Sequence, residues 1–227
     1  MIQLPALILL GIPYHKALAV HKVATVALGL GGSLRNFSTL FYDLRIVSLL
    51  LAFGIPGVLL GTFMVSILSE DFLYLILGLF SIVLGWYSLK NPDFGIRRLE
   101  IKLNSFSYLR FIFLTFFIGI LNGSVSSGTG LFVTILLIKT FGFDFLRAIS
   151  ITFFTVGIFW NASGAISLAS MGSLELDILM FLIIGSFAGG FLGSHLSKIK
   201  GNILVKKFFT ILCFSIGISI LLKIFFS

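Results

Sequence analysis

The sequence predicts an all-α protein that crosses a lipid bilayer several times, and its composition is the first observation that supports this fold class. Of its 227 residues, 58% are apolar and 11% are charged, whereas a soluble domain carries about 25% charged residues. The mean hydropathy is +1.16. Most charged residues lie in short breaks between long apolar runs, so we expect those runs to be membrane spans.

Six apolar runs are long enough to cross a bilayer, whose hydrocarbon core needs roughly 20 helical residues. They cover 15–36, 46–68, 72–89, 146–169, 175–197 and 203–226. A further apolar region, 109–141, is interrupted at 122–130 by the sequence NGSVSSGTG. Irregular backbone at membrane depth is tolerated only inside protein or along a cavity, so we expect a broken helical hairpin here. The first stretch, MIQLPALILLG, lacks the basic residues and cleavage pattern of a signal peptide.

Charges in the loops predict the orientation of the spans, because cytoplasmic loops are enriched in Lys and Arg. Three loops are basic: Arg35 with Arg45; Lys90, Arg97, Arg98, Lys102 and Arg110; and Lys198, Lys200, Lys206 and Lys207. The acidic residues Glu70, Asp71, Glu175 and Asp177 mark the opposite side. This asymmetry explains the net charge of +8 without a nucleic-acid partner, for which the sequence has no basic helix or aromatic-basic module.

The two halves of the chain repeat one pattern in opposite orientations. Gly11, Ala17 and Ser33 align with Gly142, Ala148 and Gly164 at an offset of 131 residues, and Gly57, Gly61 and Gly85 align with Gly189, Gly193 and Gly217 at an offset of 132. Span 46–68 runs from a basic loop to an acidic one and its mate, 175–197, does the reverse. The pattern predicts an inverted-topology repeat.

We therefore expect a single transmembrane domain, 1–227. It consists of a first repeat (1–90), a cytoplasmic linker (91–108) and a second repeat (109–227). Residues 1–13 match only the second arm of the hairpin, so the first repeat lacks a first hairpin arm. Either translation starts upstream or this half has lost the arm.

The reactive side chains argue against most enzymes. All eight Asp and Glu residues lie in loops or near span ends, so none is placed as a proton relay or cation ligand within the membrane. The three histidines are not spaced as a metal site, the single cysteine, Cys213, excludes a disulfide framework, and neither HExxH nor GxSxG occurs. We expect no metal, no cofactor and no catalytic residue, and a cation carrier is disfavoured for want of acids within the spans.

Lys22 is the one base well inside an apolar span, where an unpaired charge costs several kcal/mol. Polar and small residues share its helix face: His15, Lys22, Thr25, Gly29, Gly32, Ser33 and Asn36. With no buried acid available, an anionic ligand is the predicted partner; the alternative is that Lys22 extends to the membrane interface. His21 lies on another face, where contact with a neighbouring helix competes with a substrate role, and its repeat mate is Thr152.

The break at 122–130 is the second candidate site. A helix beginning near Gly128 would direct free backbone N–H groups at the tip, a geometry that binds anions, although a solvated loop is the alternative. Short donors lie at the tip and on the next span. The predicted substrate-binding residues are Lys22, Thr25, His21, Asn122, Ser124, Ser126, Ser127, Gly128, Thr129, Thr152 and Asn161.

Glycines spaced four residues apart predict close helix packing. They are Gly57 with Gly61, and Gly185 with Gly189 and Gly193. Homodimerisation through such faces is compatible with the pattern.

Three features together resemble the sulfite exporter TauE/SafE family of membrane permeases: the string GIPYHKALAVHK, the glycine-punctuated GILNGSVSSGTG, and the two repeats. The resemblance covers nearly the whole chain. It implies a multi-pass protein of a bacterial or archaeal cytoplasmic membrane that moves small anions such as sulfite or sulfonates. The chain departs from the family pattern at His21, where Asn is common, and at Ser126 and Thr129, where the hairpin is richer in Gly.

We therefore expect a secondary transporter, working as an exporter, of sulfite or an organosulfonate bound near mid-membrane between the halves by Lys22, Thr25 and 122–130. Alternating access would rock one repeat against the other. A proton carried by His21, by His15 or by the substrate, and uniport without any proton, are all compatible with the sequence. The alternatives from other classes are a non-transporting accessory subunit and a membrane enzyme.

Overall fold

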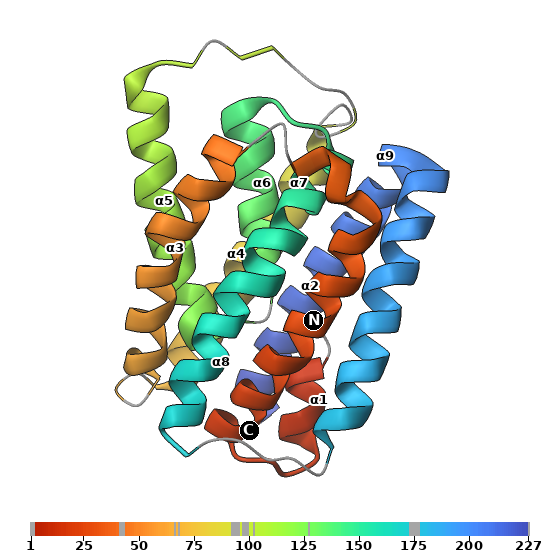
Figure 1. Cartoon of the computed structure of the whole chain (residues 1–227). Helices are drawn as coiled ribbons and strands as arrows, with labels where there is room; N and C mark the ends of the chain where they lie inside the picture. Colours follow the sequence, from red (N-terminus) through yellow and green to blue (C-terminus); the bar gives the residue numbers. More distant parts are fainter. Residues whose placement is uncertain are drawn as a thin grey trace.

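The structure is a computed structural model in which the described residues fold almost entirely into helices, with no strand among them. It describes residues 3–40, 44–65, 67, 69–91, 96, 100–101, 103–126, 128–172 and 178–226. The helices are α1 (Gln3–Leu9), α2 (Tyr14–Leu40), α3 (Leu44–Met64), α4 (Glu70–Lys90), α5 (Ser105–Ser124), α6 (Thr129–Phe141), α7 (Phe145–Thr152), the π-helix η2 (Phe153–Trp160), α8 (Asn161–Ser170) and α9 (Leu179–Phe226). Figure 1 shows them as one bundle of roughly parallel and antiparallel helices.

Five helical segments among the described residues are long and apolar enough to cross a membrane: Tyr14–Leu34, Leu44–Met64, Ser105–Ser124, Phe145–Ser170 and Leu179–Ser219. The predicted all-α, multi-span class is confirmed at this level. The last segment consists of two helices, because the chain turns at Gly201, whose φ of 75° and ψ of −176° are not helical. The two parts of α9 on either side of Gly201 correspond to the predicted spans 175–197 and 203–226. The helix α4 covers the predicted span 72–89 but is not among the five.

The helix α5 extends before the hairpin region, 109–141, that the sequence predicted. It begins at Ser105, within the expected linker, because the Asn104 side chain accepts a hydrogen bond from the Ser107 N–H at 2.8 Å and so caps the helix. Its 20 residues are enough for a full span. The following helix, α6, has only 13 residues and ends at Gly142, whose φ of 70° suits a glycine C-cap.

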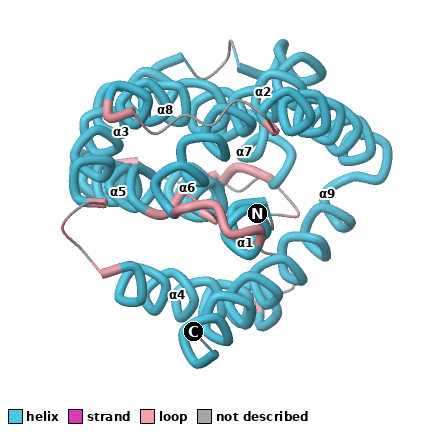
Figure 2. The backbone as a smooth tube through the Cα atoms, turned by 90° about the horizontal axis from the view of Figure 1, so that it is seen from below, coloured by secondary structure: helices cyan, strands magenta, loops and turns pink. Residues whose placement is uncertain are grey.

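The two short helices, α1 and α6, lie in the middle of the bundle, and the longer helices surround them (Figure 2). Ten of the 13 residues of α6 are buried, as are Leu4 and Leu7 of α1. The helix α2 packs against the 179–200 part of α9 and against η2 and α8, while α3 packs against α5 and α4 packs against α9. Short central helices place their ends near the middle of the molecule, where the candidate site lies.

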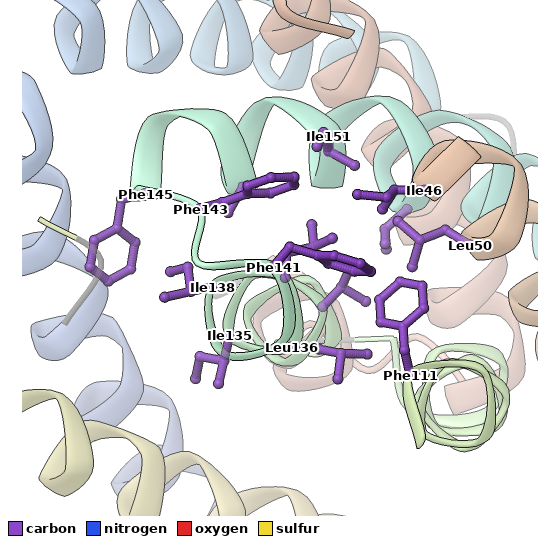
Figure 3. Packing of buried hydrophobic residues seen from close by; sticks show 14 of the residues in the cluster. Ile46, Leu50, Phe111, Ile135, Leu136, Ile138, Phe141, Phe143, Phe145 and Ile151 are labelled. Atoms are coloured by element: carbon purple, nitrogen blue, oxygen red, sulfur yellow. The ribbon is translucent and has the colours of Figure 1, made fainter. Parts of the chain in front are cut away.

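An aromatic core lies where α6 passes into α7 (Figure 3). The Phe111 and Phe141 rings meet edge to face with centroids 4.8 Å apart, and the Phe141 and Phe143 rings stack at 5.7 Å. The residues Ile46 and Leu50 of α3 complete the packing. Because this core joins α3, α5, α6 and α7, it fixes the position of α6 relative to the rest of the bundle.

Glycines set the distance between α3 and α5, as predicted for Gly57 and Gly61. A Cβ on Gly61 would lie 2.9 Å from the Gly123 Cα, and a Cβ on Gly57 would lie 3.1 Å from the Gly119 Cα. The two backbones therefore touch.

The prediction of close packing at Gly185, Gly189 and Gly193 is wrong within this chain. No atom of the described residues lies within 4 Å of a Cβ built at any of the three, and all three residues are exposed. The helix α9 instead packs on α2 through Gly190, whose Cβ would overlap the Leu28 carbonyl. A helix has several faces, and the sequence spacing alone does not say which one a neighbour covers.

Candidate functional site

Lys22 lies in the interior of the bundle with none of its surface exposed. Its Nζ donates to the backbone carbonyl of Asn122 at 2.7 Å and to the Asn122 Oδ1 at 3.2 Å. The side chain therefore points inward from α2 to the end of α5, and in this structure it does not extend to the membrane interface. Burying an ammonium group next to neutral oxygens only partly offsets its desolvation.

Asn122 connects this ammonium to the break between α5 and α6. The Asn122 Nδ2 donates to the Thr129 Oγ1 at 2.8 Å, and the Thr129 hydroxyl donates to the Ser126 carbonyl at 2.7 Å. These bonds close the turn from the last residues of α5 to the first residue of α6. They also place hydroxyl and amide groups next to the positive charge.

The backbone of the break adopts left-handed conformations at two of its described residues. Gly128, the N-cap of α6, has φ 85°, and Ser126 has φ 61°. A left-handed conformation is free of strain for glycine, but for a residue with a side chain it costs on the order of 1–2 kcal/mol. Strain of this kind tends to persist at functional sites.

The helix α8 completes the site through Asn161 and Gly164. The Ser126 hydroxyl donates to the Asn161 Oδ1 at 3.3 Å, and the Asn161 Nδ2 donates to the Val156 carbonyl at 2.8 Å. A Cβ on Gly164 would lie 2.9 Å from the Lys22 Cε and 3.0 Å from its Nζ. The absence of a side chain at residue 164 therefore leaves the room that Lys22 occupies.

Asn161 is the first residue of α8 and follows directly on the π-helix η2. The Val156 carbonyl accepts the backbone N–H of Asn161, five residues on as in a π-helix, and also its side-chain amide. Short π-helical segments are found frequently at functional sites. We call the set Lys22, Asn122, Ser126, Thr129, Asn161 and Gly164 the Lys22 site.

Four other predicted residues lie outside these contacts. The Thr25 hydroxyl donates to the His21 carbonyl of its own helix at 2.7 Å, and the Ser124 hydroxyl donates to the Ile120 carbonyl at 2.9 Å. His21 is buried against α1, where its Nδ1 lies 3.0 Å from the Gln3 Oε1. The Thr152 hydroxyl lies 3.1 Å from that of Thr134 on α6. Two further residues were predicted to bind substrate. Gly128 is the N-cap of α6 described above, and Ser127 lies outside the described residues.

The structure adds contacts that the pattern of the sequence did not single out. The Tyr14 hydroxyl donates to the Ser124 carbonyl at 2.7 Å and so ties the start of α2 to the end of α5. Gln3 contacts His21, and Thr134 contacts Thr152. A polar residue within an otherwise apolar stretch, as at Gln3, is the signal that could have found one of them.

The chemistry that this arrangement supports is the binding of a small negative group. One ammonium contacts the two oxygens of Asn122, and from Asn122 a network of amide and hydroxyl groups runs through Thr129 to Ser126 and Asn161. The Lys22 site contains no carboxylate. Within the described part of the chain, no three His, Cys, Asp or Glu side chains group as metal ligands.

Comparisons with known proteins agree over almost the whole chain. A family model described as sulfite exporter TauE/SafE matches residues 1–220. The chain is similar to a probable membrane transporter protein of Haemophilus influenzae, with 26% identity over 218 residues that cover 94% of this chain and 83% of the relative. It is also similar to a probable membrane transporter protein, ORF9, of a Sinorhizobium species, with 27% identity over 228 residues that cover 97% and 84%. No solved structure matches the chain.

Proposed function

The chain belongs to the sulfite exporter TauE/SafE family, and from this premise we propose that it is a secondary transporter that exports a small anion, sulfite or an organosulfonate, across a bacterial or archaeal cytoplasmic membrane. The observation that carries the anionic substrate is the buried Lys22 ammonium at the break between α5 and α6. A charged group of this kind inside a membrane protein is expensive to keep and is a functional candidate by default.

Substrate binding at this site would exchange one partner of Lys22 for another. The ammonium now has only oxygens of Asn122 as described acceptors, both of them uncharged. A sulfite or sulfonate group offers three oxygens that share negative charge, and charge-assisted hydrogen bonds are about twice as strong as neutral ones. The hydroxyls of Ser126 and Thr129 lie in the same network, where they now donate to the Asn161 Oδ1 and the Ser126 carbonyl, and they would turn to the anion to complete its shell.

Several matching features of the two halves support the proposed inverted repeat. The helices α2 and α7 start at Tyr14 and Phe145, 131 residues apart, and the glycines just before them, Gly11 and Gly142, both have positive φ. At the same offset, the contact between His21 and Gln3 corresponds to the contact between Thr152 and Thr134.

The positions of two turns in the bundle support the proposed opposite directions of the halves. In Figure 1 the turn from α1 to α2 lies at the bottom, and the turn from α6 to α7 lies at the top. The region 109–141, with α5, its break and α6, is the proposed broken hairpin.

The Lys22 site lies between these halves, which suits alternating access. Lys22 belongs to the first repeat, 1–90, whereas Asn122, Thr129 and Asn161 belong to the second, 109–227. If one repeat rocks against the other, the bond between Lys22 and Asn122 is the contact that must break and form again. Coupling to a proton on His21, on His15 or on the substrate is compatible with this cycle, and so is uniport.

Flux of a panel of sulfite and sulfonates into proteoliposomes tests the proposal. We expect saturable flux for the wild type and a loss of at least about tenfold for Lys22→Ala, because the only charge in the site is removed. Lys90→Ala, which removes an exposed charge at the end of α4, is the matched control and should keep its flux. A neutral solute reports leakage.

The outcomes separate transport from the site. Flux that survives Lys22→Ala would retain the transporter and reject Lys22 as the binding group. Folded protein that moves no member of the panel would reject the proposed function.

A further inference from the structure

Two buried threonines on α5 and α6 have hydroxyl groups that the fold does not use. Among the described residues, three buried side-chain hydroxyls have no hydrogen-bond partner, those of Ser33, Thr115 and Thr140. Thr115 lies on α5 and Thr140 lies on α6. A buried hydroxyl without a partner has given up its hydrogen bonds to water for nothing in return, so each such group needs an explanation.

Other threonines in the helices of this chain satisfy their hydroxyls within their own helix. The hydroxyls of Thr134, Thr152 and Thr155 each donate to the carbonyl four residues earlier, at 2.9, 2.9 and 2.8 Å. This bond is a common one for threonine inside a helix. Thr115 and Thr140 do not make it, so their hydroxyls remain available to another acceptor.

The period of the helix places both threonines between α5 and α6. The bond from the Asn122 Nδ2 to the Thr129 Oγ1 marks the sides on which these two helices face each other. Thr115 precedes Asn122 by seven residues, and Thr140 follows Thr129 by 11. At about 100° per residue, each threonine lies only about 20° from the side that its helix turns to the other. We call Thr115 and Thr140 the threonine pair.

The threonine pair lies between the Lys22 site and the end of the bundle that carries the basic loops. At about 1.5 Å per residue, Thr115 lies about 10 Å along α5 from Asn122. By the same measure Thr140 lies about 16 Å along α6 from Thr129. Both displacements run toward the start of α5 and the end of α6, so the pair is deeper than the surface but separate from Lys22.

Cationic groups lie at that end of the two helices. The Arg45 guanidinium lies 4.8 Å from the centroid of the Tyr108 ring, and the Arg147 guanidinium lies 4.7 Å from that of Phe143. Both rings contact Phe141, which follows Thr140 in the chain. Positive charge raises the local concentration of anions, so an anion attracted to this end would arrive close to the threonine pair.

We propose that the threonine pair is a second binding site for the transported anion, on its route between the basic end of the bundle and the Lys22 site. Each hydroxyl supplies one donor, and the oxygens of sulfite or a sulfonate accept such bonds. Two neutral donors bind an anion weakly enough to pass it on, as conduction through successive sites requires. This inference rests on the proposed function.

The second site is closed in the present structure. The rings of Phe111 on α5 and Phe141 on α6 meet edge to face with centroids 4.8 Å apart (Figure 3). Phe111 lies one helical turn before Thr115, and Phe141 is next to Thr140. These two rings must therefore separate before an anion from the basic end reaches the threonine pair.

Removal of the two hydroxyls tests the site through flux and stability together. We expect the double variant Thr115→Val with Thr140→Val to lower saturable sulfite flux into proteoliposomes at least about tenfold, the effect of losing hydrogen bonds to a charged group. Its Tm in detergent should hold or rise, because the hydroxyls that it removes have no partner. The double variant Thr115→Ser with Thr140→Ser keeps both hydroxyls and should keep most of the flux.

Thr210→Val is the matched control, with the opposite expected pattern. The Thr210 hydroxyl lies 2.8 Å from that of Ser88 and donates to the Lys206 carbonyl at 3.0 Å, in the contact between α4 and α9. Its removal should lower the Tm and leave the flux unchanged.

Thiol labelling locates the second site without a measurement of flux. In a Cys213→Ser background, Thr140→Cys should react with a methanethiosulfonate reagent that carries a sulfonate group. The reaction in membrane vesicles should be faster from the side of the basic loops than from the other side, and methanesulfonate should slow it. Thr210→Cys, which replaces another buried threonine, should remain unlabelled.

Three results would overturn the second site: full flux in the double valine variant, a loss of flux that comes with a fall in Tm, or a Thr140→Cys protein that is not labelled. The proposed function fails in another way, as a wild type that moves no anion. Labelling at Thr140→Cys does not depend on flux, so the two failures are distinguishable.

Discussion

The Lys22 Nζ lies 2.7 Å from the backbone carbonyl of Asn122, near the C-terminal end of α5. The last carbonyls of a helix carry partial negative charge and favour a cation. The contact thus stabilises the fold in the absence of an anion, and it joins the two halves of the chain at the proposed binding site. Variants of the site can separate the contribution of this contact to stability from its contribution to transport.

Asn122→Asp would supply a permanent anion to Lys22. The carboxylate oxygen replaces Oδ1 at 3.2 Å from Nζ, so an internal ion pair forms where a substrate would otherwise bind. We expect sulfite or sulfonate flux to fall at least about tenfold while thermal stability in detergent is maintained. Undiminished flux in a folded Asn122→Asp protein would mean that Lys22 does not meet the anion.

Gly164→Ala should displace Lys22 without changing any charge. The new Cβ would lie 2.9 Å from the Lys22 Cδ and Cε, and overpacking of this kind costs about 1–3 kcal/mol. We expect weaker substrate binding, measured as a raised KM for flux, with a lowered Tm. Gly185→Ala controls for the general effect of replacing a glycine in a span, because its Cβ meets no atom within 4 Å in the part of the chain that the structure describes.

Two glycines that the proposed repeat aligns should respond differently to the same substitution. Gly61→Ala drives a Cβ against the Gly123 Cα at 2.9 Å, whereas a Cβ at Gly193 meets no atom of the described residues within 4 Å. We expect Gly61→Ala to lower the free energy of unfolding by about 1–3 kcal/mol and Gly193→Ala to leave it nearly unchanged. Denaturation of the monomeric form in detergent measures both, and equal losses would contradict the packing described here.

The left-handed conformation of Ser126 predicts an unusual order of stability at that position. Glycine adopts φ 61° without strain and alanine does not. Both substitutions lose the hydroxyl that donates to Asn161, so the difference between them reports the backbone alone. We expect Ser126→Gly to be more stable than Ser126→Ala by about 1 kcal/mol, and chemical denaturation of the two variants checks the sign.

Tyr14→Phe should loosen the attachment of α2 to the end of α5. The hydroxyl that donates to the Ser124 carbonyl at 2.7 Å is lost, and a buried hydrogen bond contributes about 0.5–1.5 kcal/mol. We expect a fall in unfolding free energy of that size. Tyr108→Phe is the control, because the Tyr108 ring packs against Phe141 at 5.9 Å and the substitution keeps that ring.

Some features of the site could be predicted from local sequence alone. Lys22, Asn122, Ser126, Thr129 and Asn161 are polar residues in apolar surroundings. Their cost inside a membrane makes them candidates wherever the helices are placed. The sequence could not say that the Thr25 hydroxyl bonds to its own helix or that Thr152 meets Thr134, because the choice among neighbours depends on how the helices assemble.

The sequence by itself determined the fold class and the positions of the helices in the chain. Whether a run of residues is apolar and long enough to span a bilayer is a local property, since every backbone polar group in lipid must be satisfied within its own helix. The helices α2, α3, α4 and α9 accordingly form where apolar runs predict them.

Only the tertiary structure decided which helix faces meet. The 3.6-residue period tells which residues share a face but not which helix lies against it. For that reason Gly57 and Gly61 are packed and Gly189 and Gly193 are open, although their spacing is the same. The meeting of Lys22 with Asn122, 100 residues away, likewise depends on the order of helices in the bundle and on the short α6 at its centre.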